Sequence, residues 1–385
     1  MNPIYKTQIL QGHSRPIKDL KFSKDGKYIF SASSDRLVLK WDSNSNQKLV
    51  TYNHQASVNV ICISQNNKWM FTGDSTGCIY IWDLDTNEIF RKVEFDAILN
   101  IRSIDISTDD LYIIVTLGSR AKNSKSFVNS YLTKDFLNED SKDDKNVPKE
   151  YKSFICRNQE TKFVKSLFTN FNKSILVSRE DGQLEMINFE NNLLISSEKF
   201  HNDIILDFDV NYDNGLIITS SKDSYLCLIN LNTFQLVRKF QPINPTRNLN
   251  ACKIAIIDNP YYRIPGINNG VISVDNLFDL NEDINTLIEN ENFSNVDTSK
   301  FGKSKKIILA IVSGGQDSKF VTTTNQKEGG FDIIMYNAMN GEELASFLDH
   351  FGPVNTLAIC GNVLASGAED ATVRIHKIEY YLFPK

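Results

Sequence analysis

Short runs of alternating hydrophobic and polar residues, separated by turn-forming residues, open the chain. Residues 17–22 (IKDLKF), 27–33 (KYIFSAS) and 37–42 (LVLKWD) are three such runs, and SKDG and SDR separate them. Alternation with period two predicts β-strands, and the Gly, Asp and Ser residues between the runs predict tight turns. In the third run Leu37, Leu39 and Trp41 share one face, so we expect a sheet with a buried side.

A frame of histidine, aspartate and a large side chain recurs along the chain at similar intervals. Its copies, complete or partial, are His13, Asp35 and Trp41; His54, Thr76 and Trp82; Asp181 and Ile187; His201, Asp223 and Ile229; and His350, Asp370 and His376. Repeats of roughly 40 residues that open with Gly-His and close with Trp-Asp are the signature of WD40 β-propeller blades.

The same residue types could instead form a hydrolase triad, in which histidine activates a serine and aspartate orients the histidine. The copies are scattered over most of the chain, however, and cannot share one active site. We therefore expect each histidine to bind the aspartate of the next turn and a Ser or Thr hydroxyl between them, as a structural brace. The brace residues expected on this basis are His13, Asp35, Trp41, His54, Trp82, Asp181, His201, Asp223, His350 and Asp370. No catalytic residue, metal ligand or cofactor site is expected, and the protein is not expected to be an enzyme.

The tryptophan position of the frame allows the blades to be counted. Its occupants are Trp41, Trp82, Tyr131, Ile187, Ile229, Tyr336 and His376. This series predicts an all-β, seven-bladed propeller that forms one domain over residues 1–385. The longer intervals contain a charged loop at 133–150 and an insertion at 258–305 in blade six, and the second of these intervals would also accommodate an eighth blade.

The two ends of the chain are expected to close the ring. After His376 too few residues remain for another blade, whereas residues 4–10 (IYKTQIL) alternate like a strand and precede the first repeat. We expect residues 4–10 to supply the missing outer strand of the last blade, which removes an open sheet edge.

Composition narrows the class of protein further. A net charge of −5 and a pI near 5.7 argue against a basic nucleic-acid-binding surface. The first ten residues do not read as a signal peptide, and the longest apolar run, 307–312, is too short to cross a bilayer. The six cysteines show no metal-ligand spacing, and buried, reduced thiols fit a cytoplasmic protein.

Two stretches outside the repeats invite a functional interpretation. The lysine-rich FGKSKK (301–306) lacks the first glycine of a phosphate-binding loop, so we expect a solvated loop end there. Residues 277–290 place Leu277, Leu280, Ile284, Leu287 and Ile288 at helical spacing. Such a helix could pack on its own propeller or dock on a partner.

Motifs in the last two blades resemble those of a specific family. Gly314, Gly315, Gln316 and Asp317 are followed by the threonine triplet 322–324, and HFGP stands at 350–353. His376 at the last tryptophan position and LQGH at 10–13 complete the pattern. Together they resemble subunit i of eukaryotic translation initiation factor 3, over roughly 4–95, 200–256 and 306–380 and more weakly over 96–198.

The resemblance implies a non-catalytic scaffold subunit of that initiation factor, which acts during assembly of the small-ribosomal-subunit initiation complex. It implies docking of a C-terminal helix of subunit b and binding of subunit g, with the small ribosomal subunit reached through the complex. No direct nucleic-acid or membrane contact is expected. The alternative is a WD40 adaptor of another complex, such as a signalling or RNA-processing scaffold.

Two acidic residues of the fifth blade are candidates for the contact with subunit b. Asp223 is also the brace aspartate of that blade, so its role could equally be structural. Asp207, in IILDFDV, has no partner in the repeat frame, which favours a contact. A carboxylate at an interface can bind an arginine with both oxygens.

Overall fold

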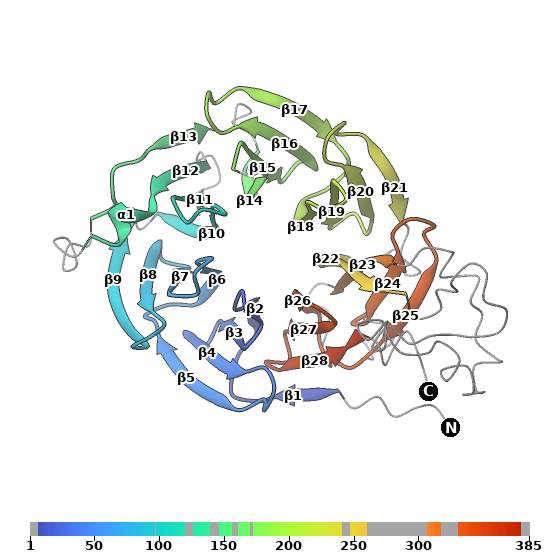
Figure 1. Cartoon of the computed structure of the whole chain (residues 1–385), viewed down its shortest axis with the longest axis horizontal. Helices are drawn as coiled ribbons and strands as arrows, with labels where there is room; N and C mark the ends of the chain where they lie inside the picture. The colour runs from blue at the N-terminus through green and yellow to red at the C-terminus, as the bar shows by residue number, and fades with distance from the viewer. Residues whose placement is uncertain are drawn as a thin grey trace, which may run out of the picture.

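The fold is a closed ring of seven four-stranded antiparallel sheets around a central channel (Figure 1). The computed structural model describes residues 7–96, 98–119, 126–138, 146–155, 161–169, 172–240, 247–259, 306–316 and 330–378. The prediction of seven blades is confirmed. All seven residues of the tryptophan series lie in the third strand of a blade, at equivalent register positions opposite the second strand.

Blades one to four each run from an inner strand at the channel to an outer strand at the rim. Blade one contains β2 (Ile17–Phe22), β3 (Tyr28–Ser33), β4 (Leu37–Asp42) and β5 (Lys48–Asn53), and blade two contains β6 (Val58–Ile63), β7 (Trp69–Asp74), β8 (Cys78–Asp83) and β9 (Glu88–Glu94). Blade three contains β10 (Leu99–Ile106), β11 (Tyr112–Ser119), β12 (Phe127–Leu132) and β13 (Lys152–Ile155), and blade four contains β14 (Phe163–Thr169), β15 (Ser174–Arg179), β16 (Gln183–Asn188) and β17 (Leu194–Lys199).

Blades five to seven complete the ring. Blade five contains β18 (Ile205–Asn211), β19 (Leu216–Ser221), β20 (Leu226–Asn230) and β21 (Leu236–Phe240), and blade six contains β22 (Asn248–Asp258), β23 (Lys306–Gly315), β24 (Ile333–Asn337) and β25 (Glu343–Phe347). Blade seven contains β26 (Val354–Cys360), β27 (Val363–Ala368) and β28 (Val373–Lys377), with β1 (Gln8–Leu10) as its outer strand.

Pairing of β1 with β28 confirms the expected closure of the ring. Gln8 lies opposite Ile375 and Leu10 opposite Val373, and the Leu10 side chain is buried against both blade one and blade seven. Residues 4–6 of the expected strand lie outside the described residues. The outer strand of the last blade therefore comes from residues that directly precede the first blade in the chain.

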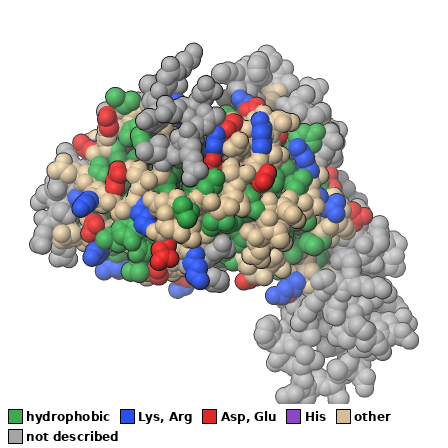
Figure 2. Space-filling model, turned by 90° about the horizontal axis from the view of Figure 1, so that it is seen from above, with side chains coloured by type: hydrophobic (Ala, Val, Ile, Leu, Met, Phe, Trp, Pro, Cys, Tyr) green, Lys and Arg blue, Asp and Glu red, His purple; other side chains and the backbone are tan. Residues whose placement is uncertain are grey.

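The hydrophobic core lies between neighbouring blades rather than at the centre of the ring. Each buried cluster combines residues from two adjacent sheets; one joins Ile17 and Trp41 of blade one to Ala365 and Ile375 of blade seven. Each sheet is hydrophobic on both faces because it packs against a neighbour on each side. The rim in Figure 2 instead mixes charged and hydrophobic side chains.

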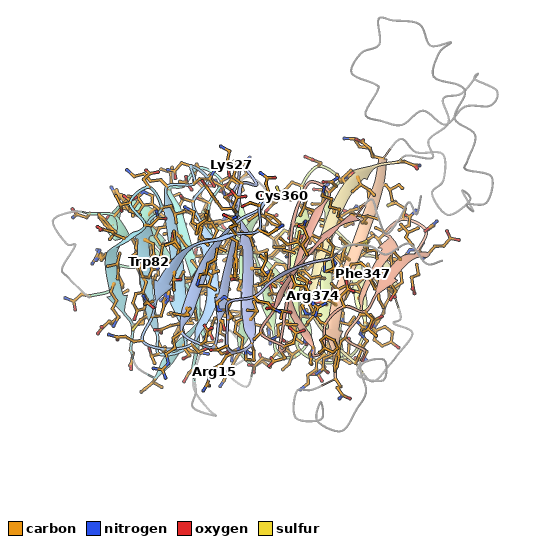
Figure 3. All side chains as sticks on the ribbon, turned by 90° about the horizontal axis from the view of Figure 1, so that it is seen from below. Arg15, Lys27, Trp82, Phe347, Cys360 and Arg374 are labelled. Carbon is orange, nitrogen blue, oxygen red and sulfur yellow. The ribbon has the colours of Figure 1, made fainter. Side chains whose placement is uncertain are left out.

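The two faces of the disc are formed by different connections. One, named here the histidine face, carries His13 and Arg15, which precede an inner strand. The opposite face carries the turns between the first and second strands, such as Lys27 and Cys360. Figure 3 shows Arg15 at one face and Lys27 with Cys360 at the other.

The two expected loop regions differ in part from the prediction. The range 133–150 begins with a short helix, α1 (Thr133–Phe136), whose Phe136 is fully buried against Tyr131 and Phe71. The prediction of a loop throughout 133–150 is therefore wrong for its first four residues, because the buried side chain of Phe136 anchors them to the core. In the range 258–305, Asp258 still pairs with Lys306 as the last residue of β22. Residues 260–305, including the expected helix at 277–290, lie outside the described residues.

Candidate functional site

The complete brace in blade one is a single line of hydrogen bonds from tryptophan to aspartate. The Trp41 indole N–H donates to Ser31 Oγ over 2.9 Å, and Ser31 Oγ lies 2.8 Å from His13 Nε2. His13 Nδ1 lies 2.8 Å from an oxygen of Asp35. With the ring neutral, each group donates to the next, so every polar atom in the line has a partner. The geometry joins two turns to the third strand.

Burial argues against a catalytic use of this triad. The His13 and Asp35 side chains are 1% and 5% exposed, and Ser31 is completely buried. Burial lowers the pKa of His13 against the opposing effect of Asp35, which favours the neutral ring. The serine accepts from tryptophan and is not open to a substrate.

Blades five and seven contain the same brace with substitutions. In blade five His201 Nδ1 lies 3.1 Å from Asp223 and Nε2 lies 2.9 Å from Thr219. Burial opposes ionisation of Asp223, but the hydrogen bond from His201 and backbone N–H donors outweigh it and lower its pKa to about 2.

In blade seven His350 binds Asp370 and Ser366 over 3.0 and 2.8 Å. His376 Nε2 lies 3.0 Å from Ser366 Oγ and so takes the place that Trp41 has in blade one. This contact explains why a histidine can occupy the tryptophan position, since a ring nitrogen reaches the hydroxyl in both blades.

The other predicted brace residues have different partners. His54 Nε2 and the Trp82 N–H both bind Thr72, but His54 Nδ1 is buried without a partner among the described residues. In blade four Asp181 binds Arg179 over 2.6 Å in place of a histidine. Buried Arg179 also binds Glu185 over 2.6 Å, so an ion cluster occupies the site of the brace.

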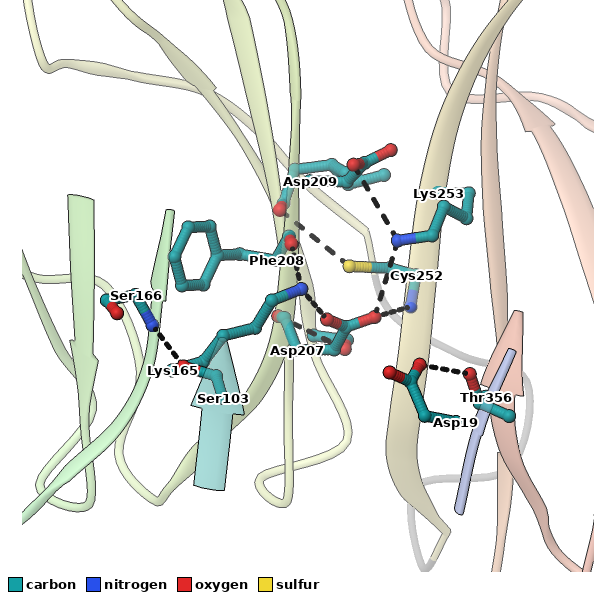
Figure 4. A network of polar contacts seen from close by, with 12 residues as sticks. Asp19, Ser103, Lys165, Ser166, Asp207, Phe208, Asp209, Cys252, Lys253 and Thr356 are labelled. Atoms are coloured by element: carbon teal, nitrogen blue, oxygen red, sulfur yellow. Dashed lines mark hydrogen bonds and ion pairs between the residues drawn. The ribbon is translucent and has the colours of Figure 1, made fainter. Parts of the chain in front are cut away.

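Asp207 has structural partners, although the repeat frame provides none for it. Its side chain is 15% exposed and faces the channel, where one oxygen lies 2.5 Å from Lys165 Nζ and the other accepts the Cys252 N–H over 3.1 Å (Figure 4). Burial would raise the pKa of Asp207, but the charges of Lys165 and Lys253 outweigh it and lower the pKa to about 2. The expectation that Asp207 lacks a structural partner is therefore wrong.

The contact made by Asp207 belongs to a pattern that the repeat frame did not reveal. At every seam a side chain of one inner strand binds the backbone of the next inner strand, whose free edge faces the channel. The pairs are Asp19–Ile61, Asn59–Ile101, Ser103–Ser166, Lys165–Phe208, Asp207–Cys252, Asn250–Val354 and Asn355–Ile17. Backbone groups at an edge need partners, and these side chains supply some of them.

The channel is hollow, and among the described residues that line it six are lysine or arginine and three are aspartate. A cavity of about 280 Å³ lies between the inner strands, and the Lys165–Asp207 ion pair joins two neighbouring strands of its wall, β14 and β18. Lys253 lies 3.6 Å from Asp209 and 3.9 Å from Asp207; burial opposes its charge, but these carboxylates outweigh it and raise its pKa. Within the described residues no group of three His, Cys, Asp or Glu side chains is placed to hold a metal ion.

Two buried arginines were missed because the repeat frame has no position for them. Arg179 stands where Ser33 and Ser221 stand in blades one and five, and Arg247 binds Asp332 over 2.5 Å in blade six. The sequence carried a signal for Arg179, which follows the apolar run ILVS and precedes Glu180 and Asp181. It carried none for Arg247, whose partner Asp332 is 85 residues away in the chain. Charged residues are almost never fully buried unless paired.

Comparison with known proteins extends this picture beyond the fold. The WD domain, G-beta repeat family matches residues 4–42, 46–83 and 341–377. The subunit I protein of eukaryotic translation initiation factor 3 from Kluyveromyces lactis is 24% identical over all of this chain and 94% of its own length. Those from Schizosaccharomyces pombe and Saccharomyces cerevisiae are 24% and 26% identical, over 98% and 97% of this chain and 96% and 93% of their own lengths.

The chain is similar to these subunit I proteins over nearly its whole length and theirs. The resemblance inferred from the motifs is thereby confirmed. Within the family fold, the matched repeats are those that carry a tryptophan or the complete histidine brace of blade seven. The tryptophan positions of blades three to six, occupied by Tyr131, Ile187, Ile229 and Tyr336, fall outside the matched residues. No helix among the described residues is long and apolar enough to span a membrane.

Proposed function

We propose that the chain is a non-catalytic scaffold subunit of eukaryotic translation initiation factor 3 that acts in the cytoplasm. The observation that carries the proposal is the similarity to subunit I proteins over the whole chain and nearly their whole length. The braces support the non-catalytic part, since their serine, histidine and aspartate side chains are buried and committed to one another. A ring tied at every seam suits a rigid platform for other subunits.

The partners in this proposal are a C-terminal helix of subunit b and subunit g, which dock on the propeller during assembly of the initiation complex on the small ribosomal subunit. We propose that the helix of subunit b docks on the fifth blade. Asp223 lies in the turn between β19 and β20 on the histidine face and is 8% exposed at its side chain. Asp207 lies in the channel and would act by holding β18 and β22 together rather than by touching the helix.

Purification of the tagged chain from its own cells, with identification of the proteins that accompany it, tests the proposal. We expect the other subunits of initiation factor 3 in constant proportion, together with small-subunit ribosomal proteins. Recovery of a signalling or RNA-processing assembly without these subunits would favour the alternative of a WD40 adaptor in another complex.

A further inference from the structure

Every inner strand of the propeller carries a β-bulge near the histidine face. The pairing of each inner strand with the second strand of its blade shifts register close to the start of the inner strand, so that one residue is left out of the pairing. These residues, named here the bulge ring, are Lys18, Asn59, Arg102, Val164, Leu206, Asn250 and Asn355. Bulges redirect side chains and recur beside functional sites.

The bulge ring surrounds the end of the channel cavity that lies toward the histidine face. All of its members except Val164 line that cavity. Their chemistry changes around the circle: blades one to three contribute Lys18, an asparagine and Arg102, blades four and five contribute Val164 and Leu206, and blades six and seven contribute asparagines. No member of the ring carries a carboxylate. This end of the channel therefore combines a cationic arc with an apolar arc.

Hydrogen bonds to neighbouring blades hold the ring in place. Each of its three asparagines donates a side-chain N–H to a backbone carbonyl of the next blade, over distances between 3.0 and 3.2 Å. Arg102 Nη1 does the same, donating to the Phe163 carbonyl over 2.7 Å. Because these contacts fix the side chains before any ligand arrives, binding costs little additional ordering.

The two cations of the ring use only part of their hydrogen-bonding capacity in the contacts to their carboxylates. Lys18 Nζ lies 3.4 Å from Glu369, and Arg102 Nη1 lies 2.9 Å from Glu180. An ammonium group has three N–H donors and a guanidinium group has five. The Lys18 and Arg102 side chains are 36% and 21% exposed. Both can therefore donate to an anion in the cavity.

The aspartates deeper in the channel do not cancel this positive charge. Asp19, Asp105 and Asp207 each accept a backbone N–H from the next blade, and burial raises the pKa of Asp105, which favours its neutral form. Lysine and arginine outnumber aspartate among the described residues of the cavity lining. A cleft lined by an excess of one charge raises the local concentration of ions of the opposite charge.

We propose that the bulge ring binds a compact carboxylate with a short apolar tail. The carboxylate accepts N–H groups of Lys18 and Arg102, and the tail packs against Leu206. The cavity of about 280 Å³ lies just below the usual range of ligand pockets, so the ligand is the size of one amino-acid residue. A free carboxylic acid and the C-terminal residue of a polypeptide both have this chemistry. The site is independent of the proposed role in initiation.

Titration of the full chain with methyl groups labelled for NMR tests the proposal, and the Leu206 methyl signals are the reporter. The probes are N-acetylleucine, which carries a carboxylate and an apolar tail, and N-acetylleucinamide, which has the same tail without the charge. We expect saturable shifts of the Leu206 signals with the acid and much smaller shifts with the amide. A pentapeptide that ends in leucine distinguishes the two sources: tighter binding than N-acetylleucine assigns the site to a chain terminus, and equal or weaker binding assigns it to a free acid.

Substitutions of opposite effect make the test specific. Lys18→Gln should weaken binding of N-acetylleucine about tenfold, because it removes a charge-assisted hydrogen bond. Glu369→Gln should strengthen binding, because it removes the carboxylate that competes for Lys18. Lys27→Gln is the matched control and should leave the affinity unchanged, since Lys27 lies on the opposite face of the same blade and is also 3.4 Å from its carboxylate, Asp25.

Two results would overturn the proposal. Equal shifts with the acid and the amide would show that the apolar tail alone is recognised. An affinity for N-acetylleucine that Lys18→Gln leaves unchanged would show that the ring does not hold the carboxylate.

Discussion

The braces show that different side chains can fill the same position of the repeat and make an equivalent hydrogen bond. Trp41 in blade one and His376 in blade seven each bond the hydroxyl of a serine through a ring nitrogen. Blade two keeps the histidine, the hydroxyl and the tryptophan but has no aspartate for His54 Nδ1. All three blades retain a Ser or Thr hydroxyl that links the turn before the first strand to the third strand.

The blade-two variation leads to a paired prediction. His201→Ala should lower the free energy of unfolding by ~3 kcal/mol, since Asp223 loses its partner in a buried site. His54→Ala should cost only ~1 kcal/mol, because it removes one neutral hydrogen bond. Urea unfolding of both variants provides the measurement. Equal losses would show that the aspartate adds nothing to the brace.

The channel carboxylate predicts a dependence of stability on acid. The pKa of Asp207 is lowered to about 2 in the folded protein, below the value of about 3.9 in an unfolded chain. A lowered folded-state pKa gives stability that is present above pH ~4 and is lost as the pH falls toward 2. Asp207→Asn should therefore flatten the pH dependence of urea unfolding in that window. Asp213→Asn, at an exposed turn, should leave it unchanged.

The two acidic candidates for the contact with subunit b can be separated by matched substitutions. Asp223→Lys and Asp35→Lys remove the same brace aspartate from blades five and one, so both should lower the melting temperature. Only Asp223→Lys should lose binding of the C-terminal segment of subunit b in a pull-down. Equal binding by both variants would remove Asp223 from the contact. Asp207→Lys should destabilise the fold, because it places a lysine beside Lys165 and Lys253.

At the level of elements, the strand pattern predicted most of the fold and the side chains at the seams did not follow from it. Alternation and the tryptophan series located all third strands, including Ile187 and Ile229. The seam residues Asp19 and Asp207 look like ordinary polar positions in an alternating strand, because their partners belong to another blade. A contact between a side chain and the backbone of the next inner strand leaves no sequence signal on the backbone side.

Among the strands, β1 is short, yet its removal should lower the stability of the ring strongly because β1 closes it. Deleting residues 1–10 would expose the edge of β28 and the buried faces that Leu10 covers. We expect a melting temperature lower by more than about 5 °C and aggregation on heating. Deleting residues 1–6 leaves β1 in place and serves as the control. A melting temperature within about 2 °C of the full chain after the longer deletion would contradict the role of β1.

At the scale of the whole molecule, the described residues form a closed ring around a channel lined by polar and charged side chains, and its two faces are formed by different connections. Its braces hold the histidine face, and its seams hold the channel. Both networks use their reactive side chains in structural contacts, so we expect the binding surfaces to consist mainly of turns at the two faces. A platform for other subunits is the use that such a molecule suits best.

Sedimentation of a cell lysate through a sucrose gradient, after brief chemical fixation, tests that account most directly. The account predicts that the tagged chain migrates with small ribosomal subunits and with the other subunits of initiation factor 3, and that little remains at the top of the gradient. A chain that sediments with a different assembly, or alone while the other subunits remain on the ribosomal particle, would contradict it.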